Sequence, residues 1–189
     1  MLAYLPNEDM DNWYKKECLD VRSSMDSLLG KEVRPDPEKH MRIMRAYANL
    51  DKDFGFEMGY NWLTTSLLYY NNDDEEKAFW CLCAVMIEFN WKGFYTLQDS
   101  KDGVPPRIAR LRAEIHDFVI EHIPKAMAAI LEEDDEMGVS VVENNLVDQL
   151  FTSLFTRAVP IEYSSRILDI FFWECTGEWT LMRILGNIL

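Results

Sequence analysis

FGFEMGYNWLTTSLL, residues 54–68, is the stretch around which the rest of the chain is organised. Two glycines, Gly55 and Gly59, interrupt a dense run of aromatic and aliphatic residues there. Glycine is typical of places where the backbone turns with positive φ or where another group approaches closely, because a Cβ atom would clash. The stretch therefore predicts a loop that feeds a buried helix, with a functional surface at the loop. Packing of one helix against another is the alternative role for the two glycines.

The composition is that of an ordinary soluble globular protein. The chain has 189 residues, of which 48% are hydrophobic and 28% are charged, so we expect one domain with a packed core. Its net charge is -14 and its pI is about 4.6. An acidic surface repels phosphate backbones and anionic lipid headgroups, and the sequence has no local basic patch. We therefore expect neither nucleic-acid binding nor direct membrane insertion.

Cysteine usage and the apolar runs indicate a cytoplasmic chain. The cysteines show no repeated Cys-x-x-Cys spacing, and the start of the chain has no signal-peptide pattern. We interpret all of them as small apolar filler in a reducing compartment: Cys18, Cys81, Cys83 and Cys175. The longest apolar run, residues 78–87, is about half the length that a membrane-spanning helix needs.

Capping signals predict helices in the first part of the chain. A first helix is expected from residue 7 or 9 to about residue 22. Asp36, Pro37 and Glu38 then combine an N-cap residue, a proline at the first helical position and an acid beside it. These three residues predict a helix over residues 37–49 that buries one side.

The centre of the chain predicts two more helices. Residues 61–70 are apolar on nearly every side, as expected for a central helix that its neighbours cover. The acids at 73–76 then place negative charge in the first turn of the next helix, where the helix dipole favours it. The apolar stripe of that helix recurs at helical spacing: Phe79, Leu82, Met86 and Phe89.

The second half of the chain continues the helical pattern. An amphipathic helix after Pro105 and Pro106 is marked by Ile108, Leu111, Ile115, Phe118 and His122. Further apolar spacing runs through Leu146, Leu150, Leu154 and Phe155, stops before Pro160, and resumes through Ile167, Ile170, Phe171 and a final segment at 179–189. No segment alternates with period two, so we predict an all-α fold of roughly nine or ten helices.

No self-contained active site or metal site is evident. Glu114, His116, Asp117, Glu121 and His122 share a helix, but the two histidines face away from each other, which disfavours metal binding. Residues 99–103 lack the alternating oxygen ligands of a calcium loop. The sequence has no Gly-x-Ser-x-Gly motif, no P-loop and no dinucleotide fingerprint, so we expect no cofactor.

The order of segments resembles the TBC domain, the family of GTPase activators that act on Rab proteins. RILDIFFWECTGEWTLMRILGNIL, residues 166–189, resembles the Arg-Ile-Trp-Asp stretch of the family and the helix after it, with Leu168 in place of the tryptophan. LFTRAVPIE (154–162), EEKAFWCLCAVM (75–86) and RAYANLDKDFGFEMGYN (45–61) resemble earlier family segments. The resemblance covers residues 17–189 of a single TBC-like domain at 1–189. Its N-terminal helices are expected to be short or absent and its C-terminal helices to be truncated.

The resemblance implies a two-finger mechanism, which can be compared with this chain residue by residue. In the family, an arginine of an Ile-x-x-Asp-x-x-Arg motif neutralises charge on the transferring phosphoryl group, and a glutamine of Tyr-x-Gln-Gly orients the attacking water. The first motif aligns with Glu17, Asp20 and Ser23, and the second with Phe56, Glu57, Met58 and Gly59. Serine thus stands at the arginine position and methionine at the glutamine position, and neither can replace the group that the family uses.

The resemblance leads to one hypothesis and one alternative. The hypothesis is a domain that binds a Rab-class GTPase through Asp20, Ser23, Phe56, Met58, Gly59 and Asn61, with GTPase activation weak or lost. Arg22 is a candidate substitute finger, although on a helix it points about 100° away from Ser23. Such a domain would be cytoplasmic and peripheral at endomembranes through its partner. The alternative is a helical protein-interaction scaffold with no GTPase partner.

Overall fold

Helices form the framework of the part of the chain that the structure describes. The computed structural model describes residues 36–52, 54, 60–96, 103–122, 150–157 and 159–188. In these residues six α-helices and two short helical turns occur and strands are absent, which confirms the all-α prediction. Six helices are fewer than the roughly nine or ten expected for the chain, so that number is wrong for the described part. The helix expected before residue 22 lies outside it.

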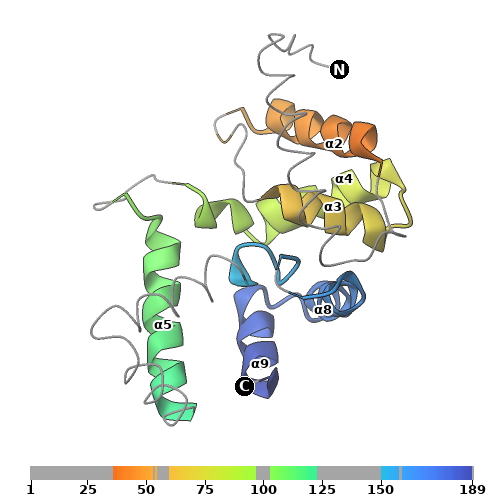
Figure 1. Cartoon of the computed structure of the whole chain (residues 1–189). Coiled ribbons are helices and arrows are strands. Elements are labelled where there is room, and N and C mark those ends of the chain that lie inside the picture. Colours follow the sequence, from red (N-terminus) through yellow and green to blue (C-terminus); the bar gives the residue numbers. More distant parts are fainter. Residues whose placement is uncertain are drawn as a thin grey trace.

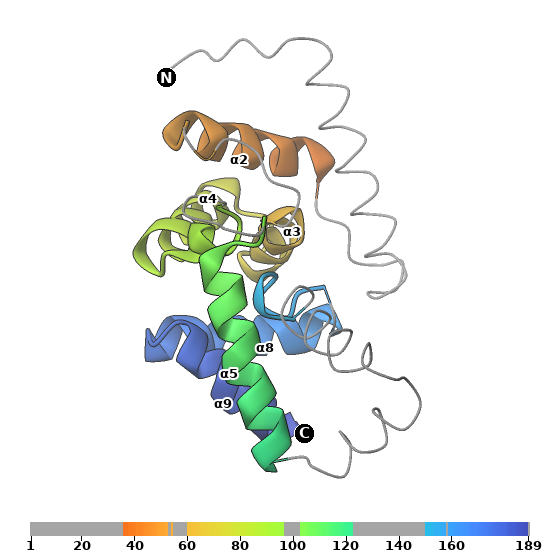
Figure 2. The same ribbon diagram turned by 90° about the vertical axis from the view of Figure 1, so that its left-hand side faces the viewer.

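The first described helix is α2, Pro37–Leu50, and its start is the predicted one. The Asp36 side chain accepts a hydrogen bond from the backbone N–H of Glu38 at 2.9 Å, and Pro37 occupies the first turn. One face of α2 is buried, as the sequence predicted: His40, Met41, Ile43, Met44 and Tyr47. This face lies over α3, Tyr60–Tyr70, and α4, Glu75–Cys83 (Figures 1 and 2).

The central helix is α3, which confirms the interpretation of its nearly continuous apolar sequence. It contacts α2 and α4 on one side of the molecule and α8, Ile161–Glu174, on the other. Eight of its residues are buried: Tyr60, Asn61, Leu63, Thr64, Thr65, Ser66, Leu67 and Leu68. The buried helix α3 therefore holds its own first residues, Tyr60 and Asn61, in a fixed position.

The helix α4 begins as predicted but does not continue regularly. The Asp74 side chain caps it by accepting a hydrogen bond from the Lys77 N–H at 3.1 Å. After Cys83 the backbone forms a π-helical turn, η1, over Ala84–Glu88, and then a 3-10 turn, η2, over Trp91–Phe94. Val85 and Met86 are buried within the π turn.

Helix α5, Pro106–His122, is the predicted amphipathic helix. Its residues Ile108, Leu111 and Ile115 are buried, and Phe118 packs against the core at partial exposure. Helix α5 descends beside α9, Glu178–Ile188, at the end of the molecule away from α2 (Figures 1 and 2).

The segment before α8 corrects one prediction. Leu154 and Phe155 were expected to continue a helix, but both have left-handed backbone angles, with φ of 52° and 64°, and lie in turns. Both side chains are fully buried or nearly so, at 0% and 1% exposure. Burial of the two side chains therefore offsets the energetic cost of a backbone conformation that residues with a Cβ atom rarely adopt.

The cysteines divide into two groups. Cys83 is buried and Cys81 is half-buried, as expected for apolar filler, and burial raises the pKa of the Cys83 thiol to about 11. Cys175 is exposed at the end of α8, so the filler interpretation is wrong for that residue. Cys18 lies outside the described residues. No described helix has both the length and the apolar character required to cross a bilayer.

Candidate functional site

Most of the residues that the sequence singled out lie outside the described part of the chain. Those residues are Asp20, Arg22, Ser23, Phe56, Met58 and Gly59, and only Asn61 is described. The structure does describe both flanks of segment 55–59, at Phe54 and at the start of α3. The base of that segment is therefore where the site can be built from contacts.

Asn61 lies inside the fold, in the first turn of α3. Its side chain belongs to a residue only 1% exposed, and its carboxamide has no hydrogen-bond partner among the described residues. Its backbone carbonyl oxygen lies 3.1 Å from His40 Nε2 and accepts a hydrogen bond from Thr65 Oγ1 at 3.1 Å. Because a carbonyl can only accept, His40 carries its proton on Nε2. A binding role for Asn61 stays a prediction.

An aromatic cluster closes the base of segment 55–59. The Phe54 ring lies 5.7 Å from the Tyr60 ring, 6.0 Å from the Tyr47 ring and 6.1 Å from the Tyr95 ring, measured between centroids. Tyr47 and Tyr60 also contact each other edge to face at 5.8 Å. Aromatic pairs at these separations add stabilisation beyond the area that they bury. The two residues that flank the segment are thus held together with a side chain from α2 and with Tyr95, which follows η2.

An ion pair and a hydrogen bond stabilise the same region around Phe54. Asp51, only 14% exposed, pairs with Lys92 Nζ at 2.8 Å and accepts a hydrogen bond from the Phe54 N–H at 3.3 Å. Burial, with the nearby Asp51 carboxylate, raises the pKa of the Tyr47 hydroxyl. The sequence gave no signal for the Asp51–Lys92 pair, because residues 41 positions apart share no helical spacing.

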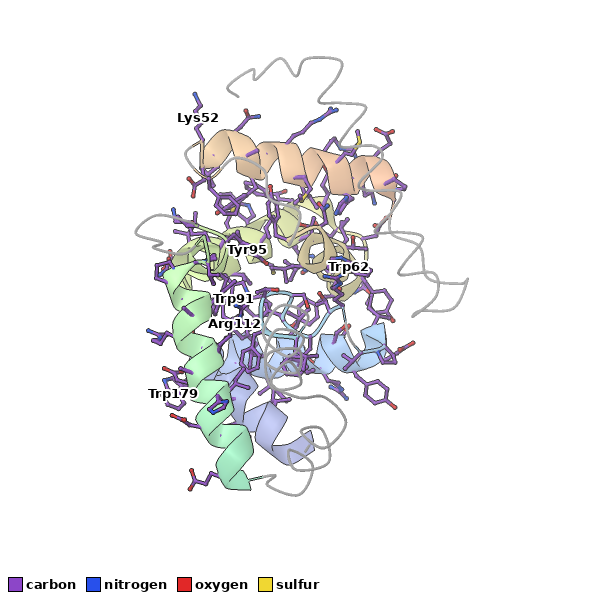
Figure 3. The ribbon with its side chains drawn as sticks, turned by 60° about the vertical axis from the view of Figure 1, so that its left-hand side comes forward. Lys52, Trp62, Trp91, Tyr95, Arg112 and Trp179 are labelled. Atoms are coloured by element: carbon purple, nitrogen blue, oxygen red, sulfur yellow. The ribbon has the colours of Figure 1, made fainter. Side chains whose placement is uncertain are left out.

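The cluster is joined to the C-terminal half of the chain through one carbonyl group. The Thr152 carbonyl oxygen accepts hydrogen bonds from Tyr95 Oη at 2.7 Å and from Trp91 Nε1 at 3.0 Å. Figure 3 shows Trp91 and Tyr95 between α2 at the top of the view and α9 at the bottom. The turn that contains Thr152 is therefore coupled to the base of segment 55–59 by direct contacts.

The acidic face of α5 does not form a metal site within the described residues. No group of three or more potential metal ligands is found among them. Glu114 instead pairs with Arg110 at 3.4 Å, one turn away on the same helix. The His122 side chain lies outside the described residues.

A cleft of about 760 Å³ opens between the end of α8 and α9. Apolar side chains form much of its lining, and its charged groups are Asp169, Glu174 and Arg183, of which Arg183 pairs with Glu174 at 3.0 Å. Trp173 on its rim is 88% exposed, which is unusual for so large an apolar side chain. Asp169 accepts a hydrogen bond from Tyr70 Oη at 2.8 Å, and burial together with this contact raises the Tyr70 pKa to about 12.

Comparison with known proteins identifies relatives at low identity. Growth hormone-regulated TBC protein 1 of Xenopus tropicalis is 27% identical over 166 residues, covering 86% of this chain and 43% of that protein. Small G protein signaling modulator 3 of Rattus norvegicus is 24% identical over 133 residues, covering 70% of this chain and 16% of that protein. GTPase-activating protein GYP5 of Saccharomyces cerevisiae is 24% identical over 195 residues, covering 100% of this chain and 20% of that protein.

The chain spans less than half the length of these relatives. No solved structure matches it significantly. The sequence model of the Rab-GTPase-TBC domain matches residues 7–189, which is nearly the whole chain. The all-α architecture and this match agree, and the chain belongs to the Rab-GTPase-TBC domain family.

Proposed function

We propose that the chain binds a Rab-class GTPase and accelerates its GTP hydrolysis weakly or not at all. The observation that carries the proposal is the family match over residues 7–189, combined with Ser23 and Met58 at the positions of the two fingers. A Rab partner would place the chain in the cytoplasm, at the endomembranes that carry the partner.

A catalytic finger contributes so much to the rate of GTP hydrolysis that serine and methionine at the two finger positions should decide that rate. An arginine finger contributes about 10³ to 10⁵ in rate, or roughly 4 to 7 kcal/mol of transition-state stabilisation. The Ser23 hydroxyl has no charge to offset the developing negative charge, and the Met58 thioether has no N–H group to orient water. Glu57 next to Met58 would also repel the phosphates of a bound nucleotide.

Binding is expected to outlast catalysis because residues other than the two fingers pack together beside segment 55–59. Phe54, Tyr60 and Tyr95 pack through their rings, and Asp51 is held by Lys92. These contacts join described residues, all of which differ from the two finger positions. We therefore expect this framework beside segment 55–59 to persist when the finger residues change.

Capture of Rab proteins locked in the GTP or GDP state tests the binding half of this proposal. We expect nucleotide-dependent capture of at least one Rab from a panel. Restoring the fingers with Ser23→Arg and Met58→Gln is then expected to raise that Rab's hydrolysis rate by at least about tenfold over wild type. If Arg22 is a substitute finger, Arg22→Ala removes whatever acceleration wild type has. Capture of no Rab in either state would contradict the proposal.

A second candidate function, a protein-interaction scaffold, is favoured by the cleft between α8 and α9. Ile170 and Trp173 are exposed on its rim beside Asp169 and Glu174. The two exposed apolar side chains suit an amphipathic helical peptide that brings apolar anchors. Titration with such a peptide, followed by tryptophan fluorescence, should shift the emission of wild type but not of Trp173→Ala. An equal shift in both proteins, or none, would contradict this function.

A further inference from the structure

Arg157 differs from most other described cations in its surroundings. On this acidic chain most described lysines and arginines lie beside carboxylates, in pairs such as Lys39–Asp73, Arg42–Glu75, Lys92–Asp51 and Arg107–Glu178. No described carboxylate lies within ion-pair distance of the exposed Arg157 side chain. Lys52 also has none, but Figure 3 shows it at one end of α2, away from Trp62 on α3.

The Arg157 guanidinium lies instead over the ring of Trp62. Its Cζ atom is 5.8 Å from the ring centroid, a cation–π contact. Trp62 is held in turn by packing against Ile161, which is buried with Tyr69 beside it. The backbone N–H of Arg157 donates a hydrogen bond to Ser153 Oγ at 3.3 Å. Both the side chain and its backbone are therefore oriented before any partner arrives.

Trp62 places this cation near the proposed partner surface. It lies in the first turn of α3, so only Tyr60 and Asn61 separate it from segment 55–59. Figure 3 shows Trp62 on α3, toward α8 and the turn that precedes it. We define the Arg157 patch as Arg157, Trp62 and Tyr69. It joins the start of α3 to the turn at 150–157.

We infer that Arg157 binds a carboxylate on the surface of the GTPase partner. This inference rests on the proposed function. A guanidinium stacked on an aromatic ring keeps its edge N–H groups available, and their fork geometry matches a carboxylate with two parallel hydrogen bonds. An acidic chain otherwise repels acidic partners, so a cation that lacks a carboxylate partner among the described residues selects a partner with a carboxylate at that point.

Affinity measurements on variants test the inference. The Kd of a captured, GTP-locked Rab is measured by calorimetry for wild type, Arg157→Ala, Arg157→Lys and Trp62→Leu. Arg157→Ala should weaken binding by about tenfold, as expected for a charge-assisted pair. Arg157→Lys should recover little of the loss because it lacks the fork, and Trp62→Leu should weaken binding because the guanidinium loses its orienting ring.

Arg166→Ala is the control, since it removes one exposed cation that is 83% accessible and pairs only within α8. It should leave the Kd unchanged. A Kd for Arg157→Ala equal to that of wild type would overturn the inference and leave the proposed function intact. A loss of hydrolysis rate at unchanged Kd would also overturn it, because the cation would then act on the phosphates. If wild type captures no Rab, the proposed function itself fails.

Discussion

The rings of Phe54 and Tyr60, the two residues that flank segment 55–59, lie 5.7 Å apart. Phe54 also contacts Tyr47 and Tyr95, so a single side chain connects α2, α3 and the residue that follows η2. Truncation of Phe54 should therefore affect both the fold and the presentation of the segment.

Phe54→Ala is expected to lower the free energy of unfolding by about 2 kcal/mol, less than for a fully buried phenylalanine because Phe54 is half-buried. It should also weaken capture of the Rab partner under conditions where the variant is folded. Urea unfolding and calorimetry measure the two effects. Leu50→Ala, a nearby residue that is 55% exposed, is the control and should change stability by less than about 0.5 kcal/mol. Equal effects of the two substitutions would contradict the role given to Phe54.

The buried His40 predicts acid sensitivity. Burial lowers the pKa of His40 from 6.5 to about 4, so the folded state disfavours its charged form. Above pH 6.5 the residue is neutral in both states and contributes no pH dependence. Between pH 6.5 and about 4 the unfolded state binds more protons, and stability falls as pH falls.

We expect His40 to lower the free energy of unfolding by about 1–2 kcal/mol at pH 5 relative to pH 7. His40→Gln should remove this part of the slope, as measured by urea unfolding at a series of pH values. His116→Gln, on the partly exposed side of α5, is the matched control. The same slope in wild type and His40→Gln would show that His40 does not titrate between the two states.

Glu178 links α9 to α5 through two arginines. It lies 3.0 Å from Arg107 and also pairs with Arg110, and the Glu178 and Arg107 side chains are only 15% and 16% exposed. Arg107 in addition lies over the Phe94 ring, 4.3 Å from its centroid. Removing the carboxylate leaves a partly buried guanidinium without its charge partner.

Glu178→Ala should therefore destabilise the fold by about 2–3 kcal/mol, below the range for a fully buried pair. Glu76→Ala removes an exposed acid in the first turn of α4 and should cost less than about 1 kcal/mol. Thermal and urea unfolding of both variants provide the comparison. If Glu178→Ala lowers the stability of the fold no more than Glu76→Ala does, the α5–α9 contact contributes little to stability.

Cys175 ends α8 in a left-handed conformation, with φ of 53°. Glycine adopts this conformation without a Cβ penalty and is the usual residue at such a helix end. Cys175→Gly should raise the free energy of unfolding by about 0.5–1 kcal/mol, whereas Cys175→Ala, which keeps the Cβ atom, should not. No difference in stability between the two variants would contradict this explanation.

The sequence predicted the helix starts well because their signals are local. Asp36 caps α2 at the predicted place, and Glu75 and Glu76 lie in the first turn of α4, as the run of acids predicted. The cap that Asp74 provides to α4 was not predicted. The π turn after Cys83 and the left-handed pair Leu154 and Phe155 were missed, because packing of buried side chains decides both and no glycine marks either place. The contact of Arg157 with Trp62 was missed as well, since residues from distant segments leave no common spacing.

The candidate site was predictable only in its position along the chain. The flanks of segment 55–59 are built by rings from three elements and by the Asp51–Lys92 pair, which no single stretch of sequence reveals. The burial of Asn61 likewise follows from the coverage of α3 by its neighbours rather than from the residue type. The roles proposed for Ser23 and Met58 still depend on the family alignment.

Single-turnover GTP hydrolysis by a captured Rab, at saturating concentrations of this domain, tests the central claim most directly. We predict acceleration of less than about tenfold over the intrinsic rate, because neither Ser23 nor Met58 can supply the charge or the hydrogen bond that the reaction requires. Acceleration by about 10³ or more in the wild-type protein would contradict the claim that the chain has kept the fold of an activator without its chemistry.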